Sequence, residues 1–416
     1  MKKRTISFLF SVICLAGQMA FGAPKYISPN NDGVQDELVI PLHITDKRYI
    51  EAWSLVILDS EGNVIRTIEN KVALPEKLAV KSIMKQLVTP KSGVPIPESI
   101  TWNGAMNNGE TAPDGIYSYY VTATDDNGNV GKTKEYQVVV DTKAPEINLI
   151  QPADKTFGEG SKSSLKIQQT GSVEDEWVAT FKTVDGKVVK TYKWANGEPA
   201  VVNWYGTNDD GEQVPDGVYS YEITAKDRAG NVSERATVTN IIYSADKPAT
   251  NIYIVGSKYF APNTESDIQT LVLNIRIPVP EEKTGNKLVE WAVVITDSKK
   301  NTVRMFDNNK MGILPPEQIL FDGKDDNGNL LPDGNYQAAV TAKYLNGYVP
   351  SKISSPVFMI DTVKPEVAVK AVNKVFGGKN LPEVRFNVTS VPNTGSPEGS
   401  WKAEIKSVET GNTVRT

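Results

Sequence analysis

The stretch that decides the fold is Trp102-Asn103-Gly104, followed eleven residues after the tryptophan by Pro113-Asp114-Gly115-Ile116-Tyr117. This block, an aromatic residue with x-Gly and then Pro-Asp-Gly-x-Tyr, starts again at residues 204 and 321 with the same spacing. An interval of roughly 100 residues suits whole domains rather than solenoid units. The chain is therefore predicted to be an array of like modules. The shared residues are Trp102, Asp114, Gly115 and Tyr117; Trp204, Asp216, Gly217 and Tyr219; and Phe321, Asp333, Gly334 and Tyr336.

The Pro-Asp-Gly tripeptide is typical of a tight turn. Proline presets φ and glycine accepts positive φ, so the following tyrosine can begin a strand. Residues 117–123 alternate apolar and mostly polar side chains, which indicates a strand with one buried face. We interpret Asp114, Asp216 and Asp333 as turn residues, with a binding role as the alternative.

A second repeated block begins with tryptophan. Trp53, Trp177 and Trp291 each open an alternating strand, a turn follows, and a basic residue stands thirteen positions after the tryptophan. This pattern predicts a β-hairpin with the tryptophan in the core. A sugar-stacking role for the tryptophans is the alternative, and Tyr120 and Tyr205 are then better surface candidates. Trp401 begins a fourth copy of the block.

Proline-containing linkers separate the blocks at residues 141–145, 246–248 and 361–365, and they predict short, stiff connections between all-β antiparallel sandwiches. Residues 74–87 could form a short helix. The fourth copy ends before a Pro-Asp-Gly block, so we expect a truncated module and a fragment of a longer protein. The predicted organisation is a signal peptide at 1–22, modules at 23–145, 146–248 and 249–365, and an incomplete module at 366–416.

The N-terminal segment has the pattern of a secretory signal peptide. Lys2, Lys3 and Arg4 precede an apolar run over 6–16, and small residues permit cleavage before Ala23. Loss of these three cations changes the formal net charge from −5 to −8, which argues against nucleic acid as a partner. No later run approaches the ~20 apolar residues of a spanning helix. We expect an exported protein, periplasmic or on the cell surface.

The small number of cysteine and histidine residues limits the catalytic and metal-binding sites that this chain could form. Cys14 is the one cysteine and His43 the one histidine, so a catalytic triad or a zinc site would have to depend on His43. Asn30, Asp32 and Asp36 form an oxygen-rich segment, for which we prefer a side-chain-capped turn over a calcium site. No catalytic residue and no cofactor is expected, with calcium as the one alternative.

Two Asn-Gly segments also suggest calcium loops, at 125–129 and 325–329. Both lack the alternating ligands and the distant glutamate of an EF-hand. An Asn-Gly pair between strands is first of all a hairpin turn, and that is our interpretation.

The blocks resemble a known family. The aromatic-[Asn/Asp]-Gly and Pro-Asp-Gly-x-Tyr pattern is similar to the immunoglobulin-like domain of the bacterial flagellar hook-capping protein. The segment 28–36, Ser-Pro-Asn-Asn-Asp-Gly-Val-Gln-Asp, resembles the opening of related domains in gliding-motility-associated proteins. The resemblance implies tandem immunoglobulin-like sandwiches, three complete and one truncated, without a catalytic set. The secretory signal departs from the hook cap itself.

These features predict a non-enzymatic structural, adhesive or spacer protein of the bacterial cell envelope. One alternative is a carrier array for a further C-terminal domain, either an enzyme or an OmpA-like peptidoglycan-binding domain. A carbohydrate-binding array is the other. The expected partner is a protein or an envelope polymer, with no nucleic acid and no membrane span.

Overall fold

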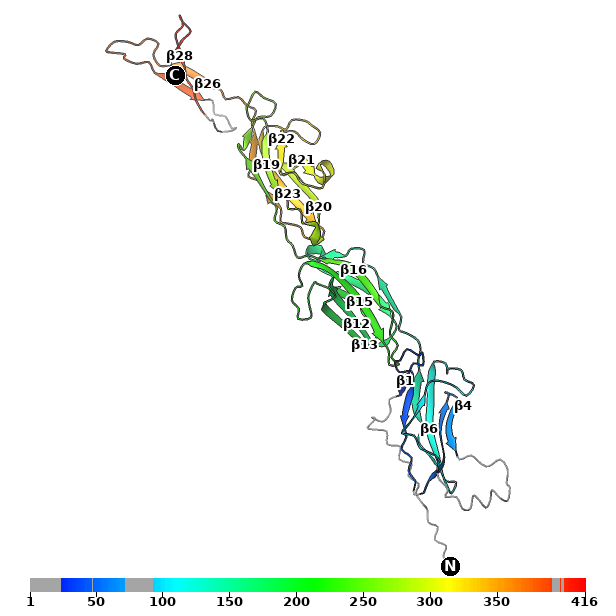
Figure 1. Cartoon of the computed structure of the whole chain (residues 1–416). Helices are drawn as coiled ribbons and strands as arrows, with labels where there is room; N and C mark the ends of the chain where they lie inside the picture. The colour runs from blue at the N-terminus through cyan, green and yellow to red at the C-terminus, as the bar shows by residue number, and fades with distance from the viewer. Residues whose placement is uncertain (1–23, 47, 72–92, 391–396, 398–399) are drawn as a thin grey trace, which may run out of the picture.

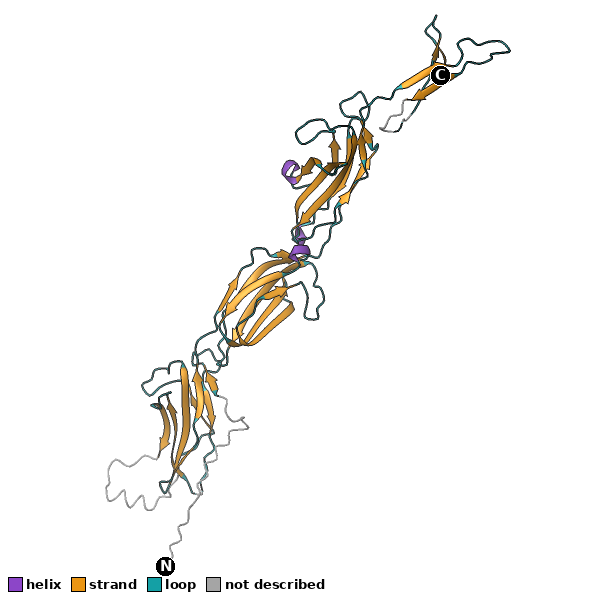
Figure 2. Cartoon of the chain, turned by 180° about the vertical axis from the view of Figure 1, so that it is seen from behind, coloured by secondary structure: helices purple, strands orange, loops and turns teal. Residues whose placement is uncertain are grey.

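A computed structural model describes residues 24–46, 48–71, 93–390, 397 and 400–416. The predicted signal peptide and the short helix predicted at 74–87 lie outside these residues. Figure 1 shows four units that follow one another along one line, with the first and the fourth unit at opposite ends of the row. Figure 2 shows the same row from behind, built almost wholly of strands and loops.

The strands fall into four groups in chain order. The first unit contains β1 (Lys25–Ile27), β2 (Leu38–Pro41), β3 (Ile50–Leu58), β4 (Val64–Lys71), β5 (Ser99–Trp102), β6 (Gly115–Asp125), β7 (Val130–Lys132) and β8 (Tyr136–Val140). The second contains β9 (Ile147–Ile150), β10 (Thr156–Phe157), β11 (Leu165–Gly171), β12 (Glu174–Thr183), β13 (Val188–Gly197), β14 (Val202–Trp204), β15 (Gly217–Lys226) and β16 (Ala236–Tyr243). The third contains β17 (Asn251–Val255), β18 (Tyr259–Phe260), β19 (Leu271–Arg276), β20 (Leu288–Asp297), β21 (Thr302–Asp307), β22 (Gln318–Phe321), β23 (Gly334–Tyr344), β24 (Ile353–Ser354) and β25 (Phe358–Ile360). The fourth contains β26 (Val367–Ala371), β27 (Phe386–Ser390), β28 (Ile405–Lys406) and β29 (Thr413–Arg415).

Each of the first three units is a two-sheet β-sandwich, and their large sheets share one strand order, while the small sheet of the first unit has two strands instead of three. In the second unit the larger sheet has the order β10-β16-β15-β12-β13 and the smaller one the order β14-β11-β9. The third unit repeats this with β18-β25-β23-β20-β21 and β17-β19-β22. In the first unit the large sheet is β1-β8-β6-β3-β4, and β2 pairs with β5. The prediction of all-β sandwiches is confirmed.

The sandwiches are antiparallel except for one pair of strands per unit. The first strand of each large sheet runs parallel to the last one, in the pairs β1 with β8, β10 with β16 and β18 with β25. A parallel pair needs a long connection between its strands, and here nearly the whole module forms that connection. This pair is the one exception in each sandwich to the antiparallel pairing that the sequence predicted.

The repeated sequence blocks build three separate cores. In the second unit Trp177 and Trp204 are both fully buried, and the Trp204 ring stacks on Phe181 with centroids 4.0 Å apart. The alternation of β15 buries Tyr219, Tyr221, Ile223 and Ala225 on one face. Aromatic burial of this kind supplies most of the stabilisation in a sandwich without disulfides.

Helix is confined to short pieces in the described residues. α2 (Asn308–Met311) follows β21, and its N-terminus is capped because the Asp307 side chain accepts from two backbone N–H groups. The 3-10 segments are η1 (Gly160–Lys162) and η2 (Glu282–Thr284). No helix in this part of the chain is long and apolar enough to span a membrane.

The fourth unit differs from the other three. The described residues form two separate two-stranded pairs, β26 with β27 and β28 with β29. Trp401 lies outside both pairs and is 51% exposed, whereas Trp177 and Trp291 are buried beside β15 and β23. No counterpart of those two strands lies among the described residues of this unit, so Trp401 lacks the neighbouring strand that lies beside Trp177 and Trp291.

Candidate functional site at the junctions between units

The Pro-Asp-Gly aspartates bind the start of each linker. Asp114 Oδ1 accepts hydrogen bonds from the backbone N–H and the hydroxyl of Thr142, at 3.0 and 2.9 Å. Asp333 holds Thr362 in the same way, at 3.0 and 2.9 Å. Asp216 accepts from the Ser244 hydroxyl, at 2.9 Å. The aspartate therefore does more than complete a turn, because it also fixes one of the first two residues after the last strand of the module.

The aromatic residues of the same blocks are core residues with polar ends. Each Pro-Asp-Gly tyrosine donates its hydroxyl hydrogen to the proline carbonyl four residues earlier. Trp102 and Trp204 donate their indole N–H to the carbonyls of Ala105 and Thr207, at 2.9 Å in both units. Phe321 has no such donor, and it takes the same buried position in the third unit.

At the first junction an asparagine of the second unit reaches the preceding linker. Asn231 is 3% exposed and follows β15 in a tight turn. Its Nδ2 donates to the Asp141 carbonyl at 2.9 Å, and its Oδ1 accepts from the Ser28 hydroxyl at 2.6 Å. Because Asp141 directly precedes Thr142, Asn231 binds the chain beside the residue that Asp114 holds.

The second junction uses an asparagine at the corresponding turn of the third unit. Asn346 is fully buried, and its Nδ2 donates to the carbonyls of Ser244 and Asp246, at 3.0 and 2.9 Å. Its own carbonyl accepts from the Glu159 N–H at 3.0 Å. Lys247 also pairs with Glu159 at 3.0 Å. The third unit therefore forms hydrogen bonds both to the linker and to Glu159, the residue that precedes η1 in the second unit.

The segment considered for calcium lies at the first junction. Asp36 accepts from the N–H groups of Asn31 and Gly33, at 2.7 and 2.8 Å, and Asp32 accepts from Val34 N–H at 2.7 Å. Asn30 Oδ1 accepts from the Asp32 N–H at 3.0 Å. The loop caps itself with its own side chains, as the preferred interpretation expects, and calcium binding there stays the untested alternative.

This loop also contacts the second unit. Gln35 Nε2 donates to the Arg228 carbonyl at 2.8 Å, and Val34 packs so closely on Gly230 that a Cβ there would stand 2.7 Å from it. The guanidinium of Arg228 lies 5.7 Å from the centre of the Tyr26 ring. The sequence did not predict these contacts between residues far apart in the chain.

Aspartate turns recur throughout the array. In each, an aspartate accepts from the backbone and side chain of an asparagine four residues later. These side-chain hydrogen bonds lower the pKa of Asp59, Asp125 and Asp297 below the ordinary value. The segments 125–129 and 325–329 are such turns, as interpreted from the sequence.

One acidic cluster in the described residues has carboxylates close enough for a cation, formed by Asp46, Asp125 and Asp126. Asp125 is occupied by its turn, and Asp126 pairs with Arg48 at 3.0 Å. His43 is exposed on the first unit, and none of the described metal-ligating clusters contains it.

The outer edge of each large sheet is covered by the Asn/Asp-rich turn. The basic residue thirteen positions after the hairpin tryptophan donates to a carbonyl of that turn, from Arg66 to Met106, from Lys190 to Asn208 and from Arg304 to Asp325. Turn side chains also accept from the edge-strand backbone, as Asp209 does from Thr191 N–H at 3.0 Å. An edge strand so occupied cannot readily pair with another chain.

The aromatic candidates for glycan stacking are divided between core and surface. Trp53, Trp177 and Trp291 are buried, so they offer no platform. Tyr205 is exposed, while the Lys132 ammonium lies 3.6 Å from the centre of the Tyr120 ring.

Comparisons with known proteins found only remote structural likenesses. No family model matches the chain, and no curated protein matches it. A solved tetra-tandem repeat from the extending region of a large adhesion protein is 18% identical, with 88% of this chain and 87% of that chain covered and a TM-score of 0.27. A structure of a 1.5-MDa bacterial ice-binding adhesin is 14% identical over 78% of this chain and 89% of that chain, with a TM-score of 0.29. Fibronectin(III)-like modules of CbhA from Clostridium thermocellum are 16% identical over 54% and 91%, with a TM-score of 0.28.

The strand order of the three sandwiches defines the class: a tandem array of immunoglobulin-like or fibronectin-III-like modules. Within that class, this chain connects its modules through an asparagine at one module's turn and the linker of the module before it. The contacts of Asn231 and Asn346 were not predicted from the sequence. One sequence pattern could have pointed to them. In successive modules an asparagine stands in the turn after the strand that begins at the Pro-Asp-Gly glycine, at positions 129, 231 and 346.

Proposed function

We propose that this chain is a non-enzymatic, exported spacer of the bacterial cell envelope, in which stiff junctions keep the modules in line. The observation that carries the proposal is the burial of Asn231 and Asn346 between one module and the linker of the module before it. A linker hydrogen-bonded from both sides loses the freedom that otherwise lets neighbouring domains reorient. The array then sets a distance between its two ends.

The surface chemistry supports a mechanical rather than a catalytic task. The repeated carboxylates are occupied in turns and linker anchors, and the lone histidine lies apart from the described acidic cluster. A catalytic site would be expected once in the chain, whereas these arrangements recur in each module. The resemblance to the hook-cap domain and the presence of a signal peptide stay predictions within this proposal.

Junction stiffness can be measured by the distance distribution between pairs of spin labels. Cys14 is the one cysteine of the chain and lies in the predicted signal peptide, so introduced cysteines would be unique in the mature protein. Labels at the exposed positions Val64 and Val184 report the first junction, and labels at Val184 and Leu320 report the second. We expect narrow distributions across both junctions.

Variants of the two junction asparagines test whether their hydrogen bonds are the cause of the stiffness. Asn231→Ala should broaden only the first distribution and Asn346→Ala only the second, since each leaves linker carbonyls without their donor. The matched control is Asn129→Ala. Asn129 donates to Asp125 at 2.8 Å as Asn231 does to Asp227, but it is exposed and makes no described contact with another unit. Broad distributions in the parent, or no broadening in the two junction variants, would contradict a stiff spacer.

Export has a separate test. Expression of the whole chain in a Gram-negative host followed by N-terminal sequencing should give a mature protein that begins at Ala23. Retention of Met1 with the protein in the cytoplasm would contradict the exported location and leave the junction measurements unaffected.

A further inference from the structure

The fourth unit has an open groove between its two strand pairs. Its volume is about 890 Å³. The large apolar side chains that line it come from both halves of the unit and are all exposed. They are Val367, Val369, Phe386, Val388, Trp401 and Ile405. A contiguous apolar surface that faces solvent is typical of an interaction site.

The pair of strands on one side of the groove, β26 with β27, is amphipathic. Val369 lies opposite Val388, and cross-strand partners point to the same face of a sheet. The next pair along the strands, Lys370 with Asn387, points to the other face. Val369 and Val388 line the groove, so the apolar face of the pair is the one that borders it.

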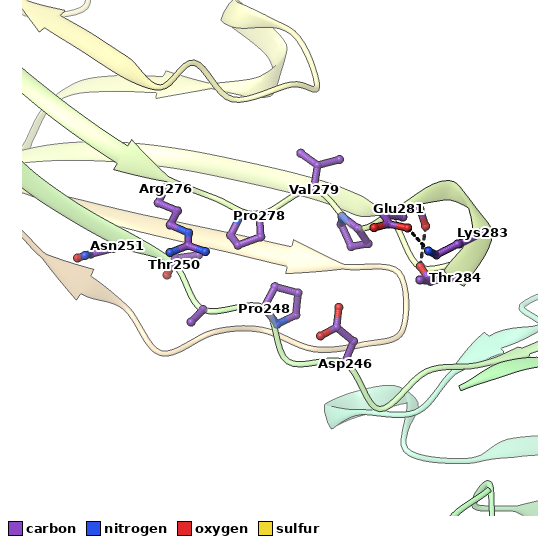
Figure 3. Close-up of a pocket in the computed structure, with 12 residues that line it drawn as sticks. Asp246, Pro248, Thr250, Asn251, Arg276, Pro278, Val279, Glu281, Lys283 and Thr284 are labelled. Carbon is purple, nitrogen blue, oxygen red and sulfur yellow. Dashed lines mark hydrogen bonds and ion pairs between the residues drawn. The ribbon is translucent and has the colours of Figure 1, made fainter. Parts of the chain in front are cut away.

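The third unit shows where such a pair belongs in a complete module. There β17 follows the linker proline Pro248, as Figure 3 shows, and pairs with β19 in the small sheet. In the fourth unit β26 follows the linker proline Pro365 and pairs with β27. Ile252 and Val369 each stand four positions after their proline, but Ile252 is buried in a core and Val369 is exposed. The fourth unit therefore presents a core face that is not covered by the described residues.

One strand in particular completes the core of each of the other three units. It begins at the Pro-Asp-Gly glycine and pairs with the strand of the hairpin tryptophan, as β6, β15 and β23 do. In all three units an alanine lies opposite the tryptophan, and a valine or isoleucine lies opposite the second residue after it. These residues are Ala123 and Val121, Ala225 and Ile223, and Ala342 and Val340. The inner face of this strand thus has one chemistry throughout the array.

The fourth unit has the tryptophan segment that such a strand would join. Its closest template is the second unit, because alanine stands two positions after the tryptophan in both, as Ala179 and as Ala403. In the second unit Ala179 lies opposite Ile223 of β15. The three strands of this kind in the described residues are buried in their own modules, so none of them is free to fill the groove. The same holds for the strands of a second copy of this chain.

We propose that the fourth unit binds a β-strand of a partner protein, with tyrosine, a β-branched residue and alanine at alternate positions on its inner face. The strand would run antiparallel to residues 401–405, with its alanine opposite Trp401 and its β-branched residue opposite Ala403. Strand addition of this kind gains affinity from main-chain hydrogen bonds and specificity from the alternate side chains. This goes beyond the proposed spacer role and does not depend on it.

The test uses the full mature chain, with a fluorescein-labelled peptide of the β15 sequence, Gly217–Lys226, as the probe. We expect the fluorescence anisotropy of the peptide to rise on binding. A peptide with Ile223→Glu should bind about tenfold more weakly or worse, because a carboxylate would be buried without a partner. Val388→Lys in the chain should weaken binding of the parent peptide for the same reason. The matched control is Thr389→Lys, which places the same charge on the other face of β27 and should leave binding unchanged.

Photocross-linking tests the register of the added strand. Tyr221 lies opposite Phe181, four positions after the tryptophan of the second unit. A benzophenone amino acid in place of Tyr221 in the peptide should therefore label the chain at or beside Ile405, as located by mass spectrometry.

Several outcomes would overturn the proposal. They are no rise in anisotropy, equal binding of the Ile223→Glu peptide, unchanged binding in Val388→Lys, and labelling of another unit. Sedimentation of the chain alone tests the competing occupant. A dimer that Val388→Lys dissociates would assign the groove to a second copy of this chain and would also overturn the proposal.

Discussion

The backbone of Gly347 lies so close to Glu159 of the preceding unit that a Cβ on the glycine would stand 2.2 Å from the Glu159 carbonyl oxygen. Gly347 also has φ of +94°, which L residues other than glycine rarely adopt. This contact places the turn of the third unit directly on the η1 loop of the second. Neighbouring modules therefore meet backbone to backbone, where no side-chain rearrangement can relieve a clash.

Gly347→Ala should open the second junction. The added methyl group would force the two backbones apart, so the spin-label distance across that junction should lengthen and its distribution should broaden. The control is Gly328→Ala in the same unit, where φ is +84° but nothing lies within 4 Å of the added Cβ. Both variants carry the same backbone strain, so equal junction distances in the two would contradict the packing argument.

Asp114→Ala should release the first linker from its module. Two hydrogen bonds to Thr142 are lost, each worth about 0.5–1.5 kcal/mol at most for so exposed a carboxylate. Amide hydrogen exchange at Thr142 should accelerate while exchange in β6 stays slow. Thr142→Val and the double variant complete a cycle, and additive effects in that cycle would show that the two residues are not coupled.

Trp177→Ala should unfold the second unit alone. The side chain is fully buried, and its loss leaves a large cavity that costs about 3–5 kcal/mol. Calorimetry of the full chain should show one transition moved to lower temperature and the others unchanged, because the three cores are separate. Tyr205→Ala, at an exposed aromatic of the same unit, should leave all transitions in place.

Alkaline pH should destabilise the second and third units. Burial raises the pKa of Tyr219 and of Tyr344 to about 12, with the charges of Asp216 and Asp246 adding to it. An unfolded tyrosine titrates near pH 10, so the stability from these neutral phenols is complete below about pH 10 and is lost as the pH rises toward 12. Urea unfolding midpoints should fall over this range. Tyr344→Phe should reduce the pH dependence of the third unit, and an unchanged dependence would assign it to other groups.

Limited proteolysis should remove the fourth unit first. Trp401, Val369 and Val388 are exposed, and the β28–β29 pair is short. Little buried surface opposes local opening there. Trypsin should cut within residues 366–416 while the third unit remains intact, with mass spectrometry locating the cut. Resistance equal to that of the third unit would mean that these residues pack more firmly in solution.

Much of each module followed from the sequence. The alternation after Tyr117 and Tyr219 predicted strands that are buried on one face, because side chains on a strand point to opposite sides in turn. The Pro-Asp-Gly turns and the tryptophan hairpins were likewise local patterns, in which proline, glycine and asparagine restrict the backbone over a few residues. The parallel pairing of first and last strands could not be read in this way, since it joins residues more than eighty positions apart.

The contacts at the junctions depend on tertiary structure. Asn231 is a turn residue by its sequence, and its role appears only when Asp141 and Ser28, both far from it in the chain, lie within hydrogen-bond reach. Local conformational preferences determine strands and turns, whereas contacts between modules depend on where whole strands end in space, and short-range rules carry no information about that.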